Sequence, residues 1–347
     1  MKTDNWLEEE KGDIWWNQVS GPLAYMNEIT SNVQQGISTV IKESDIDSLF
    51  FTILEDKIHQ KDSDFNFDET FKASNYANET EFQNDFIARL APKFVRKLTS
   101  PYKRLYSEGH LLHRFIYFEI DTDAPWVMNV MKEMCPLSFE GNGVFLCIAK
   151  DTAPYEGIKH LKALDISSYI SIYNLQYFAM QCLGNFGTRD SKGMYISQLA
   201  AKLSDVNGLV CANLAKPSLY SDTMDVCQGM DTGKVEKAVW ETQIQIFLPI
   251  IEEIRRYLIL RYTEKIQHLL PKKDEFGHEI TDPTEMELRH LQYYGRKGDN
   301  TFFDFADDMW FKAAYNARND LSHLKMLDRK TMDSLFDIEY ALKSQRI

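Results

Sequence analysis

The sequence predicts two domains of different class, an α/β domain over residues 1–215 and an all-α helical bundle over residues 230–347. The first reason is length, because 347 residues are enough for two hydrophobic cores. The second is the order strand, helix, strand across residues 113–150, which is typical of a parallel sheet. The third is the helical spacing of apolar residues beyond residue 235, where strand patterns are no longer found.

Three apolar segments are predicted to be strands of the first domain, at residues 36–41, 113–120 and 143–150. Asp45 or Asp47 is the predicted N-cap of the helix that follows the first strand, because an Asp carboxylate accepts hydrogen bonds from free backbone N–H groups. No glycine-rich loop and no Lys-Ser or Lys-Thr pair follows that strand. We therefore expect a domain that resembles a degenerate nucleotide-binding fold, P-loop-like but lacking a phosphate loop.

The second domain is predicted to be helical throughout. Apolar residues from Trp240 to Leu258 recur at spacings of four and three, which predicts a helix packed against a partner helix. This helix should reach about residue 270, with a kink or a restart at Pro249. The polar stretch 217–233 before it is the predicted domain boundary. Further helices are expected over residues 284–294, 303–325 and 329–343, the last with Asp328 as its cap.

Composition restricts the classes of function. The net charge of -13 disfavours non-specific binding to nucleic acid. The five cysteines are scattered without a C-x-x-C pair, which indicates a reducing compartment and no zinc site. The polar N-terminus is unlike a signal peptide, and no run of about 18 apolar residues is present. We predict a cytoplasmic protein that needs no membrane, no metal and no cofactor.

The candidate site residues are Arg318, Asn319 and His323. Positions four apart share a face of a helix, so Asn319 and His323 should lie together with Arg318 beside them. Histidine titrates near neutral pH and can act as acid or base, whereas a guanidinium binds phosphate oxygens in a bidentate manner. These are the groups that cleavage of RNA without a metal would need.

The motif resembles the RNase motif of HEPN domains, helical bundles in which an Arg and a polar residue precede a His in one helix. The resemblance covers residues 235–345. It implies a HEPN-like domain with metal-independent endoribonuclease activity, as in toxins and effectors of antiviral defence. Arg318 would hold the phosphate, His323 would be the catalytic acid or base, and Asn319 would orient one of them. The resemblance further implies a homodimer that binds an RNA substrate in a shared cleft.

Two alternatives remain open from the sequence. The first is a non-catalytic HEPN-like scaffold or sensor that binds a partner or a nucleotide, with a protein partner recognised by the N-terminal domain. The second is a degenerate NTPase that regulates a partner nuclease. The loop from Gly229 to Val235 is rejected as a phosphate-binding loop, because it is one residue too short and has Val235 where Ser or Thr is required.

Overall fold

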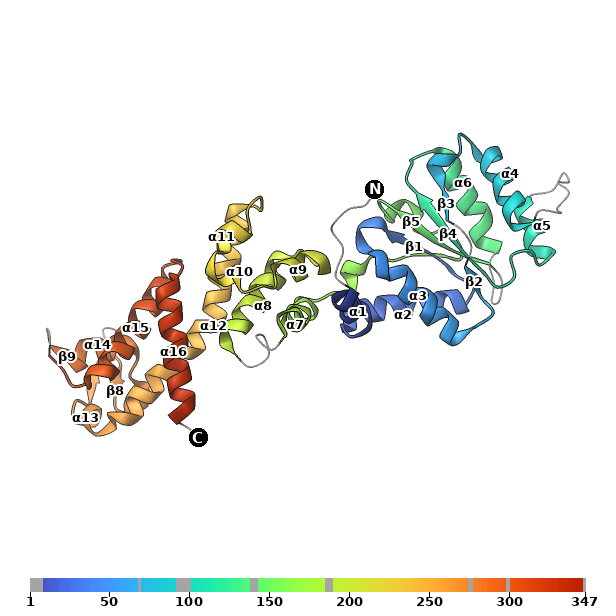
Figure 1. The fold of residues 1–347 in the computed structure, drawn as a ribbon. Coiled ribbons are helices and arrows are strands. Elements are labelled where there is room, and N and C mark those ends of the chain that lie inside the picture. The colour runs from blue at the N-terminus through green and yellow to red at the C-terminus, as the bar shows by residue number, and fades with distance from the viewer. Residues whose placement is uncertain are drawn as a thin grey trace. The chain divides into compact units, whose positions relative to one another are not determined.

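The computed structural model describes residues 9–67, 70–91, 101–137, 143–184, 190–273, 277–297 and 300–345. The chain divides into two compact units (Figure 1). Unit 1 comprises residues 1–178 and 206–209, and unit 2 comprises residues 179–205 and 210–347. The segment 217–233, where the sequence suggests a boundary, belongs to unit 2.

Unit 1 contains a parallel sheet with the strand order β2-β4-β5-β1-β6, and β3 also pairs with β4. Every described strand pair in this sheet is parallel, which confirms the predicted parallel α/β layer. The strands are β1 (Ser38–Lys42), β2 (Asn66–Phe67), β3 (Phe71–Lys72), β4 (Arg114–Ile120), β5 (Val144–Ala149) and β6 (Leu161–Ala163).

Helices cover both faces of this sheet, and for this reason the central strands β4 and β5 are apolar on both sides. On one face, alternate residues such as Ile116 and Phe118 pack into a core with Phe82 and Phe86. On the other face, Tyr117 contacts Phe51 and donates a hydrogen bond to Glu55. The helices are α1 (Glu9–Asn17), α2 (Ser20–Gln34), α3 (Ser48–Lys61), α4 (Glu79–Leu90), α5 (Pro101–Ser107) and α6 (Pro125–Met134); α7 (Ile172–Leu183) contributes residues to both units.

Unit 2 is mainly helical, as predicted. Its long helix α12 packs against α8, α15 and α16, with Phe247 in contact with Tyr195 and Phe336. This helix continues through Pro249 without a restart and ends at Arg261. The helices are α8 (Ser191–Leu203), α10 (Ser218–Ser221), α11 (Thr223–Val226), α12 (Thr232–Arg261), α13 (Thr263–Gln267), α14 (Leu288–Gly295), α15 (Phe305–Ser322) and α16 (Arg329–Gln345); α9 (Gly208–Leu214) contributes residues to both units.

Short elements complete the two units. Two small antiparallel pairs lie in unit 2, β7 (Lys272–Lys273) with β8 (Glu279–Ile280) and β9 (Arg296–Lys297) with β10 (Asn300–Thr301). The 3-10 turns are η1 (Glu43–Asp45), η2 (Ala73–Asn75), η3 (Cys135–Leu137), η4 (Ala153–Tyr155), η5 (Ile166–Ser168) and η7 (Pro283–Glu285). Among the described helices, none is long and apolar enough to cross a membrane.

Both ends of α15 are tied to α12. At its start, the buried carboxylate of Asp307 accepts a hydrogen bond from Tyr262 at 2.6 Å and contacts Arg261 Nε at 2.7 Å. Beyond its end, the buried side chain of Gln243 donates to the carbonyl of Leu327 at 3.0 Å and accepts from its N–H at 2.8 Å. These contacts fix the face that α15 presents to its neighbours.

Candidate functional site

In open α/β sheets, ligands usually bind at the carboxyl ends of strands, where the strand order reverses. In this sheet the chain continues from β1 to β2 at one edge, and from β5 to β6 at the opposite edge. The reversal therefore lies at the neighbouring carboxyl ends of β1 and β5. In nucleotide-binding folds, a phosphate at this place is held by the N-terminus of the next helix, which in this chain is α3.

The N-terminus of α3 is already occupied by a carboxylate of the chain. Oδ1 of Asp47 accepts hydrogen bonds from the backbone N–H groups of Leu49 and Phe50, at 3.0 and 2.9 Å. It accepts a third from the indole of Trp16 in α1, also at 3.0 Å. Burial raises the pKa of Asp47, although these three hydrogen bonds act in the opposite direction. The predicted N-cap role of Asp47 is thus confirmed, and its carboxylate lies where a phosphate would have to bind.

Next to Asp47, further side chains of unit 1 interact with one another at the end of β1. Lys42, at the end of β1, forms an ion pair with Asp165. Burial acts to raise the pKa of Asp165, but hydrogen bonds from Lys42 and Ser167 outweigh it, so that the pKa is lowered. Burial raises the pKa of Asp45, whose Oδ2 accepts from the N–H of Ile166 at 3.3 Å. Lys42 and the N–H of Ile166 are therefore engaged by carboxylates of the chain.

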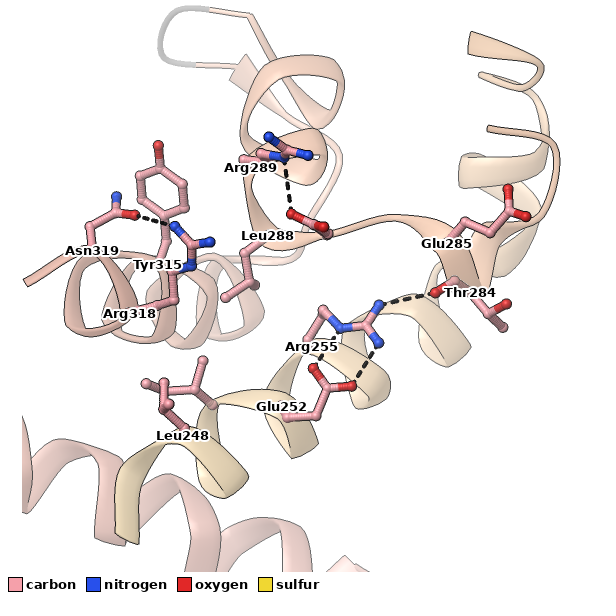
Figure 2. Close-up of a pocket in the computed structure, with 12 residues that line it drawn as sticks. Leu248, Glu252, Arg255, Thr284, Glu285, Leu288, Arg289, Tyr315, Arg318 and Asn319 are labelled. Carbon is pink, nitrogen blue, oxygen red and sulfur yellow. Dashed lines mark hydrogen bonds and ion pairs between the residues drawn. The ribbon is translucent and has the colours of Figure 1, made fainter. Parts of the chain in front are cut away.

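A cavity that includes two of the predicted site residues, Arg318 and Asn319, lies in unit 2 between α12, η7, α14 and α15 (Figure 2). It has a volume of about 460 Å³, within the usual range for sites that bind small molecules. Its lining includes three Glu and three Arg side chains together with apolar groups. These are Glu252, Glu285, Glu287, Arg255, Arg289 and Arg318, and Leu248, Ile251 and Leu288.

Two of the three arginines are committed to partners within the chain. Arg255 binds both oxygens of Glu252, at 2.8 and 2.7 Å. Its Nη1 also donates to the carbonyls of Thr284 and Met286, which ties η7 to α12 (Figure 2). Hydrogen bonding to Arg255 is the main cause that lowers the pKa of Glu252. Arg289 forms an ion pair with Glu287 at 2.9 Å.

Arg318 differs from the other two arginines. The one hydrogen bond of its guanidinium among the described residues is a long contact of 3.4 Å from Nη1 to Oδ1 of Asn319, and no described carboxylate lies within ion-pair distance. Because Oδ1 of Asn319 faces the guanidinium, its Nδ2 is directed elsewhere as a donor. Arg318 and Asn319 lie side by side next to Tyr315, on one face of α15 (Figure 2).

The ring of Tyr315 is held by a stack of aromatic rings along α15. Phe311 stacks on Tyr315 with 5.7 Å between ring centroids, and Phe303 stacks on Phe311 at 5.2 Å. Phe311 is fully buried, whereas Tyr315 is half-buried at the cavity. The ring of Tyr315 therefore forms a preset aromatic wall on the α15 side of the cavity.

His323 does not join the other two predicted residues. The helix predicted to run to residue 325 ends at Ser322, and His323 is its C-cap with φ −99° and ψ 23°. Leu324 then takes a positive φ of 59°, which turns the chain away from the helix axis. His323 is exposed and is not part of the cavity lining. The structure thus brings Arg318 and Asn319 together and leaves the imidazole outside.

The residues that complete the cavity were not among those predicted from the sequence. Tyr315 lies three and four positions before Arg318 and Asn319, so the helical spacing could have identified it. Glu252 and Arg255 are more than 60 residues away in sequence from Arg318 and are brought near by the packing of α12 on α15. No local signal in the sequence indicates that contact.

No metal cluster is found in the described part of the chain, where no three His, Cys, Asp or Glu side chains are placed to hold an ion. The expectation that the protein needs neither metal nor cofactor stays a prediction.

Neither a family model nor a curated protein matches the sequence. Solved structures do match over most of the chain at low identity. A point mutant of Thermotoga maritima RuvB is 12% identical, with 89% of this chain and 97% of that chain covered and a TM-score of 0.33. Aeropyrum pernix ORC2 with ADPNP and ADP is 12% identical, with 99% and 97% covered and a TM-score of 0.31. Drosophila ORC bound to DNA is 13% identical, with 99% and 95% covered and a TM-score of 0.34.

These comparisons correct the resemblance proposed from the motif. The structural neighbours are RuvB and ORC proteins and not HEPN proteins, so the HEPN-like assignment of residues 230–347 is wrong. The metal-independent endoribonuclease activity, the RNA substrate and the toxin or antiviral role that followed from it are withdrawn, as is the HEPN-like scaffold or sensor. The position of His323 outside the cavity agrees with this correction. At such TM-scores, the matches assign no function to this chain.

Proposed function

We propose that the chain is a ligand-binding protein that holds a small anionic molecule in the cavity between α12, α14 and α15. One observation carries the proposal. Arg318 and Asn319 present uncommitted donors at one end of the cavity, while the other two lining arginines are paired. A guanidinium with no carboxylate partner is the group that most favours an anion.

Binding is favoured over catalysis by the residue types in the cavity. Its described lining contains no His, Cys or Ser that could act as a nucleophile or as an acid and base near neutral pH. Glu252 is held by Arg255, and Oε2 of Glu285 accepts the N–H of Thr281 at 2.9 Å. The site is therefore equipped to recognise an anion and poorly equipped to transform it.

The proposal is tested by isothermal titration calorimetry of the whole chain with phenylacetate and with phenyl phosphate. At least one should bind, and Arg318→Met should weaken that binding about 10- to 100-fold, the usual effect of losing a charged hydrogen bond. Arg329→Met is the matched control, because Arg329 is an exposed arginine of unit 2 outside this cavity. Equal affinity of the parent and Arg318→Met, or no binding of either anion up to about 10 mM, would refute the proposal.

For the N-terminal part, predicted as residues 1–215, we propose an α/β domain that lacks a nucleotide site. The carboxylate of Asp47 supports this, because it would repel a phosphate at the start of α3, the first α-helix after β1. ATP should therefore give no calorimetric signal with the parent chain. Saturable binding of ATP that persists in Arg318→Met would contradict this proposal.

A cytoplasmic location, a homodimer and a protein partner of the N-terminal domain remain proposals. The location is supported by the cysteines, all of which are free thiols. Sedimentation of the purified chain would test the homodimer, and a single species of monomer mass would exclude it.

A further inference from the structure

We propose that the ligand of this cavity is a monocarboxylate with a hydrophobic group, and not a phosphate ester. This inference rests on the proposed anion site and specifies which anion it takes. It is drawn from the charge balance of the cavity, the position of its donors on α15 and the apolar side chains opposite them.

One guanidinium of the cavity has no carboxylate partner among the described residues. The three lining carboxylates and the three lining guanidinium groups carry equal and opposite charges. Arg255 pairs with Glu252, and Arg289 pairs with Glu287. Glu285 is held by the backbone N–H groups of Thr281 and Asp282, which leaves Arg318 as the described cation that can face a ligand. A carboxylate brings one charge and matches one guanidinium. A phosphate monoester brings nearly two, and the second would face unpaired repulsion from the carboxylates of the cavity.

The position of the donors on their helix disfavours a dianion further. Arg318 and Asn319 lie at the C-terminal end of α15, which ends at Ser322. The helix dipole makes this end of a helix electronegative. Phosphate sites generally use the opposite end of a helix, where backbone N–H groups converge. The guanidinium of Arg318 has to overcome that field, which it can do for one charge more readily than for two.

The donors also match the shape of a carboxylate. The guanidinium presents paired N–H groups in one plane, and Nδ2 of Asn319 can donate beside them because its Oδ1 faces Arg318. A planar carboxylate accepts two such bonds on one side and leaves its substituent directed into the cavity.

Part of the walls opposite α15 is apolar, and this part indicates a hydrophobic substituent. Leu288 and Ile251 line the cavity from α14 and α12, and Leu248 remains 39% exposed, so that a ligand can still bury part of it. The stacked ring of Tyr315 forms a flat wall on the α15 side. An aliphatic or aromatic group attached to the carboxylate would fill this space and displace water from it.

The test compares four probes on the whole chain by calorimetry: phenylacetate, phenyl phosphate, phenylacetamide and acetate. Phenylacetate should bind about tenfold or more tightly than each of the other three. Phenyl phosphate carries nearly two charges in place of one, phenylacetamide has no charge, and acetate has no ring. Leu248→Ser should lower the affinity for phenylacetate toward that for acetate. Asn319→Asp, which places a carboxylate beside Arg318, should abolish binding of both anions.

The outcomes separate this inference from the function on which it rests. If phenyl phosphate binds as tightly as phenylacetate or more tightly, and Arg318→Met removes that binding, the anion site stands and the carboxylate class is wrong. If acetate and phenylacetate bind equally, the hydrophobic part of the inference is wrong. If Arg318→Met changes no affinity, both the inference and the anion site are wrong. Circular dichroism spectra of the variants that match the parent spectrum show that each variant is folded.

Discussion

Replacing Asp47 by Ala should destabilise unit 1 by about 2–4 kcal/mol, the sum of two losses. Loss of a helix N-cap costs about 1 kcal/mol. The indole N–H of Trp16 would also lose its acceptor, and Trp16 is only 1% exposed, so water reaches it poorly. A buried donor without a partner costs about 1–3 kcal/mol more. The sum is a large part of the stability of an ordinary domain.

Urea unfolding, combined with hydrogen exchange of the amides in α1 and α3, measures this loss where it should occur. Asp231→Ala is the matched control, because Asp231 caps α12 with one bond to the N–H of Lys234 at 2.7 Å and is exposed. The control should lose about 1 kcal/mol. Formate, which resembles the deleted carboxylate, should restore stability to Asp47→Ala and not to Asp231→Ala, whereas chloride at the same concentration should not.

Asp47→Asn separates the acceptor role of this side chain from its charge. Burial raises the pKa of Asp47, so its carboxylate is protonated more easily in the folded protein than in water. The amide oxygen of Asn can still accept the same bonds, and the loss should stay below about 1 kcal/mol. Because the pKa of Asp47 is raised by folding, its protonation contributes stability at low pH, and this contribution declines as pH rises through the folded pKa. The free energy of unfolding of Asp47→Asn should lack this pH dependence. If Asp47→Ala costs no more than Asp231→Ala, the reasoning about the indole donor is refuted.

Three further predictions concern unit 2. Arg255→Met should cost about 2–4 kcal/mol and speed hydrogen exchange over residues 281–295, because the carbonyls of η7 lose their donor. The pKa of Glu252 is lowered in the folded protein, so the stability that its carboxylate contributes is present above the ordinary pKa of Glu and is lost as pH falls through the folded pKa. Acid should therefore reduce the free energy of unfolding more in the parent than in Glu252→Gln, and an equal loss in both would contradict this. His323→Ala should change thermal stability by no more than about 0.5 kcal/mol and leave phenylacetate affinity unaltered in calorimetry, since the side chain is exposed outside the cavity.

The strands that the sequence predicted are those long enough to carry a pattern. The segments at β1, β4 and β5 are runs of five to seven residues, and the predicted boundaries differ from the observed ones by two residues or less. β2 and β3 have two residues each and β6 has three. These short strands pair with β4 and β1, which are already part of the sheet. An alternation of apolar and polar residues cannot be recognised in so short a segment.

The position at which α15 ends could not be predicted from the sequence. The segment contains no glycine or proline before Lys325, and the residue with positive φ is Leu324, where a glycine would normally mark the end of a helix. Placing His323 on the same face as Asn319 required one more turn of helix than the chain forms. Arg318 and Asn319 were identified correctly as neighbours, because their relation depends only on the continuous part of the helix.

The aromatic stack along α15 connects the cavity to the interior of unit 2. Tyr315 is the outermost of three rings, and its tilt is set by Phe311 and, through it, by Phe303 beside Tyr262. A guest molecule that pushes on the outer ring must therefore displace the inner two or be excluded. Occupancy should be visible in the ring protons of Phe303, a side chain at the other end of the helix that no guest in the cavity would touch.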